Sequence, residues 1–412
     1  YINRAFAVAT AGRPGPVVLA LPEDMLAEQS NAADAKAWQA VRTAPATADV
    51  ERCAKLLGAA RRPLILIGGS GWSDATRLQL QAFSEQNGLG VANSFRCQDY
   101  FDHEHPHYVG DVGIGINPAL KQQIDDADLL LVIGARLGEM TSSGFSLFDI
   151  PCPRQTLIHV QAGAEELGHI YQPTLAINAS SASFIEALSA LSIESGYTED
   201  WLKQLRQARQ AYLDWNQPVA VAGDLQLADI VQQMRRINAD DAILCNGAGN
   251  FSGWLHRFYR YRSYRSQLAP TSGTMGYGLP AAVAAKLRYP ERQVVAFCGD
   301  GDFMMNGQEL ATAMQYQANI IVILVNNGIY ATIRMHQERD YPGRVIGTDM
   351  INPDFVALAE AYGAHAERVV ETAQFAPAYE RALKAGRPAL IELIQDAEIL
   401  SATSTISGLR KS

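Results

Sequence analysis

The stretch GDGDFMMNGQELATAMQYQANIIVILVNN, residues 299–327, places an aspartate after one apolar run and a pair of asparagines after the next. The run VVAFC precedes the stretch and the run IIVILV lies within it, so each polar group follows a predicted buried strand. The residues between them predict a helix over 306–317, which completes a strand–helix–strand unit with parallel strands. Because ligands of parallel α/β sheets bind beyond the carboxyl ends of the strands, we expect Asp300 and Asn327 to face a common site.

The residue types at this predicted site favour magnesium. One carboxylate and one amide suit Zn²⁺ poorly, since zinc prefers nitrogen and sulfur ligands. They suit Mg²⁺, which takes six oxygens and usually shares its shell with phosphates of a substrate. Gly299 and Gly301 would let such phosphates approach the backbone, and the following helix would add N–H donors. The alternative is that Asp300 only begins a turn, but the spacing, the strands and the glycines together favour a ligand site.

Composition predicts a soluble globular protein of two or three domains. The chain has 412 residues, of which 48% are hydrophobic and 19% charged. Its net charge of -9 argues against a nucleic-acid-binding protein. The basic aromatic stretch HRFYRYRSYR (256–265) could still bind a single strand. We favour the alternative that its arginines pair with carboxylates or with an anionic ligand, because the stretch is short and isolated.

The cysteines and the lack of long apolar runs indicate the cytoplasm and no membrane partner. The 5 cysteines are scattered and form no CxxC motif, so a disulfide framework or a zinc site is not expected. No apolar run approaches the roughly 18–20 residues that span a bilayer. No secretory signal is present.

Alternation of strands and helices predicts the fold class: α/β, with two Rossmann-like parallel-sheet domains and a short remnant of a third. The predicted strands are LILIGG (64–69), DLLLVIG (128–134), TLIHV (156–160), AILCNG (242–247), QVVAFCG (293–299), NIIVILVNN (319–327) and ALIELI (389–394). The predicted segments are the remnant at 1–27, a linker at 28–49, a central domain at 50–195, a second, helix-rich linker at 196–221 and a last domain at 222–412.

The first predicted segment begins inside a folding unit. Its sequence YINRAFAVATAGRPGPVVLALPEDM predicts a helix already under way, a Gly/Pro turn and a strand from Val17 to Leu21. There is no initiator Met. We therefore expect further residues of this unit to precede Tyr1.

Glycine-rich turns follow strands in both predicted domains. GGSGW (68–72) could cradle a dinucleotide phosphate, or it could be a tight strand-to-helix turn. GAGNFSGW (247–254) has a similar pattern. In TSGTMGYGLPAA (271–282), Gly276 and Gly278 would let the backbone pass close to a bulky group.

These motifs together resemble a known family. GDG followed by NN at this spacing resembles the diphosphate-binding motif of thiamine diphosphate enzymes. TSGTMGYGLPAA, DLLLVIGARLGE (128–139) and GRPGPVVLALPEDM (12–25) resemble segments of the acetolactate synthase-like family, in the same order. The resemblance covers nearly the whole chain and implies thiamine diphosphate and Mg²⁺ as cofactors. Residues 1–27 would then be the end of a pyrimidine-binding domain, and 222–412 the diphosphate-binding domain.

The resemblance also implies roles for individual residues. Asp300 and Asn327 would bind Mg²⁺ through their side chains, and Ile329 through its main-chain oxygen. The diphosphate and the cofactor rings would contact Gly249, Asn250, Phe251, Gly273, Thr274, Met275, Gly301 and Asp302. In the family, a bulky apolar residue at the position of Met275 holds the cofactor bent, so that its 4′-amino group reaches the carbon that becomes the nucleophile. Taken alone, Met275 could equally be a core residue.

Three departures from the family limit what can be transferred. The family's catalytic glutamate lies in the pyrimidine-binding domain, so no catalytic residue is named here and this chain is expected to be inactive alone. His336 stands where acetolactate synthases carry a tryptophan that shapes the acceptor pocket. It could bind substrate or move a proton near its ordinary pKa, or it could face solvent. HVQAGAEELG (159–168) lacks the acids that contact FAD in the family, which argues against FAD and leaves nucleotide binding open.

The expected activity is decarboxylation and carboligation of small 2-keto acids. Arg334 and Arg339 could meet a substrate carboxylate, or they could belong to a solvated charge run. One alternative is a decarboxylase that releases an aldehyde. Another is a non-catalytic fragment that binds the cofactor. A plain NAD-binding protein is disfavoured, since GDG…NN has no role there. The family architecture implies a homodimer or homotetramer for the full-length parent.

Overall fold

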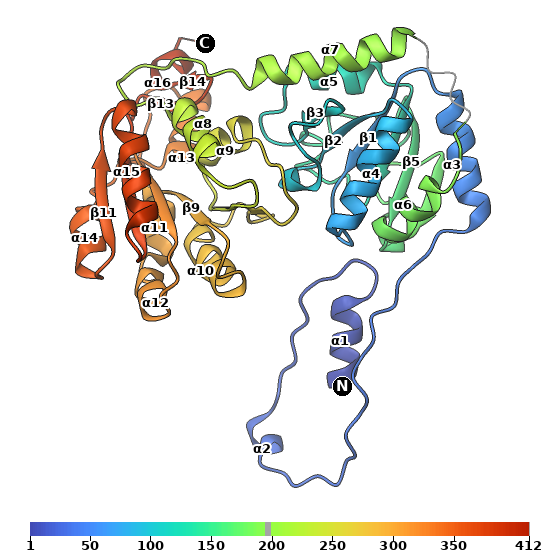
Figure 1. Ribbon diagram of the computed structural model, residues 1–412, viewed down its shortest axis with the longest axis horizontal. Helices are drawn as coiled ribbons and strands as arrows, with labels where there is room; N and C mark the ends of the chain where they lie inside the picture. Colours follow the sequence, from blue (N-terminus) through green and yellow to red (C-terminus); the bar gives the residue numbers. More distant parts are fainter. Residues whose placement is uncertain (194–198, 412) are drawn as a thin grey trace. The chain divides into compact units, whose positions relative to one another are not determined.

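The computed structural model describes residues 1–193 and 199–411 and divides into two compact units (Figure 1). One unit comprises residues 1–100 and 106–211, and the other comprises residues 101–105 and 212–412. The last two residues of the predicted central domain and the first three of the predicted second linker lie outside the described residues.

The first unit contains a parallel sheet with the strand order β3-β2-β1-β4-β5-β6. This is the order of a doubly wound Rossmann-like sheet. Its inner strands β1 and β4 are buried along their whole length, which explains the continuous apolar runs PLILI and LLLVI. The strands are β1 Pro63–Ile67, β2 Gly90–Asn93, β3 Tyr108–Asp111, β4 Leu129–Ile133, β5 Thr156–Gln161 and β6 Leu175–Asn178.

Helices α4 and α5 lie between strands of this sheet and begin at recognisable start signals. Helix α4 begins after Ser73, whose side chain accepts a hydrogen bond from the Thr76 N–H, and α5 begins with a proline after the Asn117 cap. The helices are α3 Thr47–Ala59, α4 Asp74–Gln86, α5 Pro118–Asp126, α6 Ser181–Ser189 and α7 Glu199–Trp215, with short 3₁₀ turns at Gln98–Tyr100 and Ala164–Glu166. Helix α7 accounts for the helix-rich character of the predicted second linker.

The predicted strand from Val17 to Leu21 is wrong. The segment is extended between α1 Ile2–Thr10 and α2 Glu23–Leu26, but it joins no sheet in the described part of the chain. Its side chains are exposed, with Val18 at 90%. A strand needs a neighbour for its backbone hydrogen bonds, and a favourable sequence does not supply one. The predicted helix at the start of the chain is confirmed by α1.

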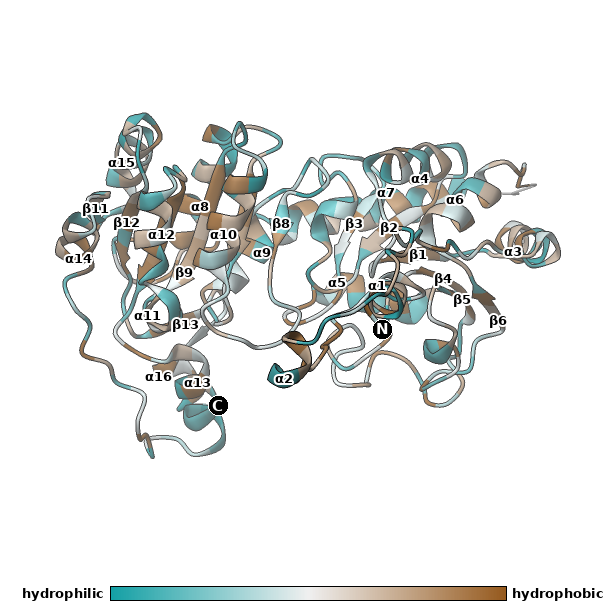
Figure 2. Ribbon diagram, turned by 90° about the horizontal axis from the view of Figure 1, so that it is seen from below, coloured by the Kyte–Doolittle hydropathy of each residue, from teal (hydrophilic) through white to brown (hydrophobic). Residues whose placement is uncertain are grey.

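The second unit contains another parallel sheet, with the strand order β11-β12-β10-β9-β7-β8. Alternate residues of its strands enter two separate cores. Val295, Phe297 and Ile323 pack with α8, α9 and α15, while Ala296, Cys298 and Val322 pack with α10, α12 and α14 on the opposite face. Figure 2 shows strand β9 of this sheet in the brown of hydrophobic residues. The strands are β7 Ile243–Asn246, β8 Gln267–Leu268, β9 Val294–Gly299, β10 Ile321–Asn326, β11 His365–Val369 and β12 Ala389–Ile394.

The helices and the C-terminal hairpin complete this unit. They are α8 Leu227–Ile237, α9 Ser252–Phe258, α10 Gly278–Arg288, α11 Asp300–Asn306, α12 Glu309–Gln315, α13 Ala331–Asp340, α14 Phe355–Ala361, α15 Thr372–Lys384, β13 Ile399–Ser401, β14 Ser404–Thr405 and α16 Ile406–Leu409. The hairpin β13–β14 is antiparallel.

The helix predicted over 306–317 is present as the shorter α12, and a further helix, α11, which was not predicted, precedes it. Helix α11 starts directly at Asp300, and α12 follows after a break at Gly307 and Gln308. A Cβ atom on Gly307 would lie 2.8 Å from the ring of Phe303, so the break brings backbone against that ring. The break also lets Phe303 pack into the core below the site.

A short piece of the chain's first half belongs to the second unit. Residues 101–105 are assigned to it, and the backbone N–H of His103 donates to the carbonyl of Tyr261 at 2.8 Å. The His103 ring is packed edge-on against Tyr261 and Tyr212. The Tyr212 hydroxyl lies 3.2 Å from His103 Nδ1.

Candidate functional site

The candidate site lies where the strand order of the second sheet reverses. The chain passes from β7 to β8 on one side and then continues to β9 on the other side of β7. Such a switch point leaves a crevice at the carboxyl ends of the two strands. The turn after β7 carries Gly249–Phe251, the turn after β9 carries Asp300–Asp302, and the loop after the adjacent β10 carries Asn327–Ile329.

Asp300 is the centre of the hydrogen-bond network at this edge. Its Oδ1 accepts from the Gly301 N–H at 2.8 Å, and its Oδ2 accepts from the N–H groups of Asn327 at 3.2 Å and Gly328 at 2.8 Å. Burial raises the pKa of this carboxyl, and these N–H donors oppose the rise. The structure thus brings Asp300 and Asn327 together, as the pairing of β9 with β10 leads one to expect.

The loop after β10 is fixed from two sides. The Asn327 side-chain Oδ1 accepts from the Ile329 N–H at 3.2 Å. The Tyr330 N–H donates to the Thr348 carbonyl at 2.8 Å, and the Met350 N–H donates to the Gly328 carbonyl at 2.8 Å. These contacts fix the loop that carries Asn327 beside Asp300, and a carboxylate with an amide oxygen is the kind of ligand set that Mg²⁺ prefers.

Sequence reasoning missed several polar residues that support Asp300. The Asn352 Nδ2 donates to Asp300 Oδ2 and also to Asn326 Oδ1, each at 2.9 Å. The Asn326 Nδ2 donates to the buried Glu392 at 2.7 Å, and Glu392 is paired with Arg368 at 2.6 Å. The asparagine pair was recognised in the sequence, but no motif marks Asn352 or Glu392.

The turn after β7 is tied to the C-terminal part of the unit. The Asn250 N–H donates to Thr332 Oγ1 at 3.0 Å, and the Asn250 Nδ2 donates to the Leu400 carbonyl at 2.9 Å. The Phe251 ring packs so close to Gly249 and Gly299 that a Cβ on either glycine would lie 2.7 Å from it. Both predicted diphosphate turns are therefore held against each other by this ring.

The predicted ring-binding stretch Gly273–Met275 lies on the surface of the unit. Gly273 and Thr274 are exposed, and Met275 is only partly buried. Its interpretation as a core residue is therefore disfavoured. A Cβ on Gly273 would meet nothing within 4 Å, so the space beside this turn is open.

Gly301 packs closely against an aromatic ring, whereas Asp302 forms a hydrogen bond with another loop. A Cβ on Gly301 would lie 2.6 Å from the ring of Tyr330, so only a glycine fits between the turn and that ring. The Asp302 carboxylate is buried, and its Oδ1 accepts from the Gly276 N–H at 2.7 Å. Its side chain therefore reaches the loop that follows Met275.

The charged residues of α13 have partners of their own. His336 is exposed, and its Nδ1 lies 2.8 Å from a guanidinium nitrogen of Arg339, which also pairs with Asp340. Arg334 donates to the buried carboxylate of Glu338 at 2.9 Å. These contacts favour the interpretation of Arg339 as part of a solvated charge run, and they give Arg334 a structural partner.

The basic stretch 256–265 makes contacts within its own unit. Arg257 lies over the Trp215 ring, with its Cζ 3.6 Å from the ring centroid. Arg260 pairs with Glu104 and Arg262 with Asp240. These pairings support the interpretation that its arginines meet carboxylates.

In the first unit, the glycines of GGSGW serve close backbone packing. A Cβ on Gly69 would lie 1.8 Å from the carbonyl oxygen of Gly134, which follows β4. The Trp72 Nε1 donates to the Gly68 carbonyl and the Tyr100 hydroxyl donates to the Gly69 carbonyl, both at 2.8 Å. This geometry supports the tight-turn interpretation of the motif.

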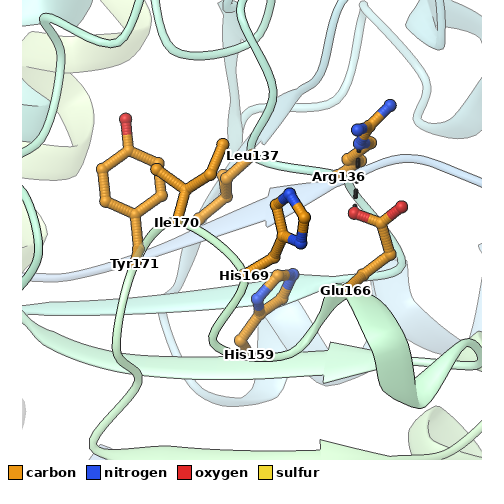
Figure 3. Close-up of a pocket in the computed structure, with 7 residues that line it drawn as sticks. All are labelled: Arg136, Leu137, His159, Glu166, His169, Ile170 and Tyr171. Carbon is orange, nitrogen blue, oxygen red and sulfur yellow. Dashed lines mark ion pairs between the residues drawn. The ribbon is translucent and has the colours of Figure 1, made fainter.

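A small polar cavity lies at the ends of β4 and β5 (Figure 3). Figure 3 shows His159 and His169 beside the ion pair of Arg136 with Glu166, whose charged atoms are 3.0 Å apart. The cavity volume of about 10 Å³ corresponds to one water molecule. The nearby Gln161 donates to the Gly134 carbonyl at 2.9 Å, so its side chain is used within the fold. This cavity has room for no more than a water molecule, and the expected absence of FAD stays a prediction.

The described helices and side chains lack two features. No helix in residues 1–193 and 199–411 is long and apolar enough to cross a membrane. Within the same residues, no three His, Cys, Asp or Glu side chains gather as a metal-binding group. The candidate magnesium site has a single carboxylate and is not of that kind.

Comparisons with known proteins agree with the fold. Residues 247–393 match the family "Thiamine pyrophosphate enzyme, C-terminal TPP binding domain", and residues 50–188 match "Thiamine pyrophosphate enzyme, central domain". The acetolactate synthase large subunit of Corynebacterium glutamicum is 30% identical over 99% of this chain and 68% of its own length. A probable acetolactate synthase large subunit of Methanocaldococcus jannaschii is 26% identical over 95% of this chain and 68% of its own length. The acetolactate synthase isozyme 3 large subunit of Escherichia coli is 28% identical over 88% of this chain and 65% of its own length.

Proposed function

The chain belongs to the acetolactate synthase-like family of thiamine pyrophosphate enzymes, and we propose that it binds thiamine diphosphate through Mg²⁺ for reactions of 2-keto acids. The observation that carries this proposal is the meeting of two loops from neighbouring strands. Asp300 Oδ2 lies 3.2 Å from the Asn327 backbone nitrogen at the switch point of the sheet. An all-oxygen site at that place suits a metal that also binds phosphate.

The residues have separate tasks in this proposal. Asp300, the Asn327 side chain and the Ile329 carbonyl hold Mg²⁺. The turns at Gly249–Phe251 and at Gly301–Asp302 border the diphosphate, and the stretch Gly273–Met275 supports the rings. When bound, the cofactor supplies an electron sink for the carbanion that remains after CO₂ leaves a 2-keto acid.

Calorimetry of thiamine diphosphate binding tests the proposal, with Mg²⁺ present and absent. We expect Mg²⁺-dependent binding by the unaltered chain and at least about 100-fold weaker binding by Asp300→Ala, because the metal loses its charged ligand. Asp240→Ala is the matched control, since Asp240 is a surface carboxylate in an arginine pair. Equal binding by Asp300→Ala and the unaltered chain would contradict the metal role.

The reaction outcome and the assembly are further parts of the proposal. We expect joining of two keto acids over release of an aldehyde, and analysis of the products formed from pyruvate separates the two. We also propose a homodimer or homotetramer as the working form of the parent protein. Sedimentation velocity with and without cofactor would measure this state directly.

A further inference from the structure

Helix α11 holds both backbone polar groups of Gly276, its N–H and its carbonyl. Its N–H donates to Asp302 Oδ1 at 2.7 Å, and its carbonyl accepts from the Asn306 side-chain Nδ2 at 2.9 Å. Gly276 is buried and has a φ of +86°, a left-handed conformation that favours glycine. A Cβ there would lie 2.7 Å from Asn306 Nδ2 and from the Met305 Cβ. The loop that carries Met275 is therefore fitted closely to α11.

Asp302 also contacts two other segments of the site. A Cβ on Gly247, in the turn after β7, would lie 1.9 Å from Asp302 Oδ1. The Cys298 thiol, at the end of β9, forms a hydrogen bond with the Asp302 side chain. Asp302 is only 2% exposed, and a buried carboxylate is costly unless hydrogen bonds compensate it. The hydrogen bond from the Gly276 N–H offsets part of this cost, and the Asp302 side chain lies against the turn after β7, the end of β9 and the loop that carries Gly276.

We propose that Asp302 and Asn306 are positioning residues, which fix the Met275 loop relative to the Asp300 metal site. Asp300 and Asp302 lie two residues apart in the first turn of α11, so the same turn that would bind metal also holds the Gly276 peptide. The inference rests on the proposed function, because it concerns where the cofactor rings are supported. It gives the Asp302 carboxylate a role in holding a neighbouring loop.

A displaced Met275 loop would weaken cofactor binding. A misplacement of about 1 Å in a positioning element can cost about 100-fold in rate or affinity. With Gly276 held at both its N–H and its carbonyl, Met275 is placed before any ligand arrives. Loss of either hydrogen bond would leave the loop free to move while Asp300 and Asn327 stay in place.

The test uses four variants of the full chain and two measurements. Asp302→Ala and Asn306→Ala each remove one hydrogen bond to Gly276. Asp302→Asn keeps an oxygen that can accept from the Gly276 N–H. Met304→Ala is the matched control, since Met304 lies on the same helix and is 50% exposed. The measurements are amide hydrogen exchange of residues 273–278 without cofactor, and calorimetry of thiamine diphosphate with Mg²⁺.

We expect exchange of residues 273–278 to be at least about tenfold faster in both alanine variants, with cofactor affinity reduced about tenfold. Met304→Ala should match the unaltered chain in both measurements, and Asp302→Asn should match it in hydrogen exchange of residues 273–278. Slower exchange or no change in both alanine variants would overturn the proposal. So would hydrogen exchange of residues 273–278 in Asp302→Asn that is as fast as in Asp302→Ala, since the negative charge would then matter more than the acceptor oxygen.

The two proposals fail in different ways. If the unaltered chain binds no thiamine diphosphate, the proposed function fails, while the exchange measurement still tests whether Asp302 and Asn306 hold the loop. If Asp302→Ala does not fold, Asn306→Ala and Asp302→Asn retain the test. A general loss of protection beyond residues 273–278 in Asn306→Ala would indicate a role in overall stability and would overturn the positioning role.

Discussion

The Asn352 side chain donates one hydrogen bond to Asp300 and another to Asn326, each across 2.9 Å. Asn352 comes from an irregular loop, whereas Asp300 follows β9 and Asn326 is the last residue of the adjacent β10. It therefore links the two strand ends that form the candidate metal site.

Replacing Asn352 with alanine should weaken this link. A hydrogen bond to a charged group contributes about 1.5–3 kcal/mol, so we expect a fall of about 2 kcal/mol in the free energy of unfolding. Urea unfolding of the protein without metal measures this change. Asn352→Asp offers a contrast, because it places a second carboxylate beside Asp300 and should destabilise the metal-free protein further. Unchanged stability in both variants would contradict the linking role.

Substituting Gly301 should interfere with cofactor binding. An added Cβ would lie 2.6 Å from the Tyr330 ring, so Gly301→Ala must displace either the ring or the turn. We expect affinity for thiamine diphosphate with Mg²⁺ to fall at least about tenfold in calorimetry. Gly253→Ala is the matched control, since a Cβ there meets nothing within 4 Å. Equal affinities in the two variants would show that the close packing at Gly301 does not matter.

The buried carboxylate of Glu338 should make stability depend on acid pH. The Arg410 guanidinium, with help from the Gly343 N–H and Arg334, lowers the pKa of Glu338 from its usual 4.5 to about 2. A lowered pKa in the folded state adds stability that is fully present above about pH 4.5 and is lost as the pH falls toward 2. Glu338→Gln should therefore be less stable than the unaltered chain at pH 7, with a difference that shrinks below pH 4.5.

Denaturant unfolding at several pH values measures this difference. Glu360→Gln serves as the control for loss of one negative charge at an exposed position. Parallel stability curves for Glu338→Gln and the unaltered chain would contradict the expected linkage. The two arginine contacts at 2.7–2.9 Å would then contribute the same stability at every pH.

Asp111 should show the opposite dependence on pH. Burial raises the pKa of this carboxyl from 3.8 to about 7, against an opposing hydrogen bond from Gln98. A raised pKa in the folded state gives stability that is present below about pH 4 and is lost as the pH rises through 7. Such a rise corresponds to at most about 4 kcal/mol, and partial exposure of Asp111 reduces it. We expect the free energy of unfolding of Asp111→Asn to be higher than that of the unaltered chain by roughly 2 kcal/mol at pH 8 and equal to it near pH 4. Denaturant unfolding at the two pH values measures this difference.

The sequence predicted strands where apolar runs are long and missed them where they are short. Strands β1, β4, β5, β7, β9, β10 and β12 all coincide with predicted runs. Strands β2 (GVAN) and β3 (YVGD) contain glycine and polar residues, and β11 (HAERV) is an edge strand with little apolar content. Their pairing depends on neighbours that are distant in sequence, so local pattern does not mark them.

Only the part of the site that lies directly at the strand ends could be predicted from the sequence. Asp300 and Asn327 converge because parallel strands bring their carboxyl ends to one edge, and this follows from sequence alone. The direction of a side chain does not follow from sequence. Asp302 was expected beside the diphosphate, yet its carboxylate reaches the Gly276 N–H. Asn352 was missed because backbone pairing of Thr348 with Tyr330 and of Met350 with Gly328 brings its loop to the site, and no sequence pattern marks that pairing.

The place of residues 101–105 within the second unit means that the two units are not consecutive modules. No single cut in the chain separates them, because residues 101–105 interrupt the sequence of the first unit. Within this insert, His103 contributes its backbone N–H and its ring to Tyr261 of the second unit. A gene fragment that starts after residue 105 would encode the second unit without this insert. Exchange of one unit between relatives would therefore need two junctions, and the five-residue insert would have to be exchanged together with its tyrosine partners.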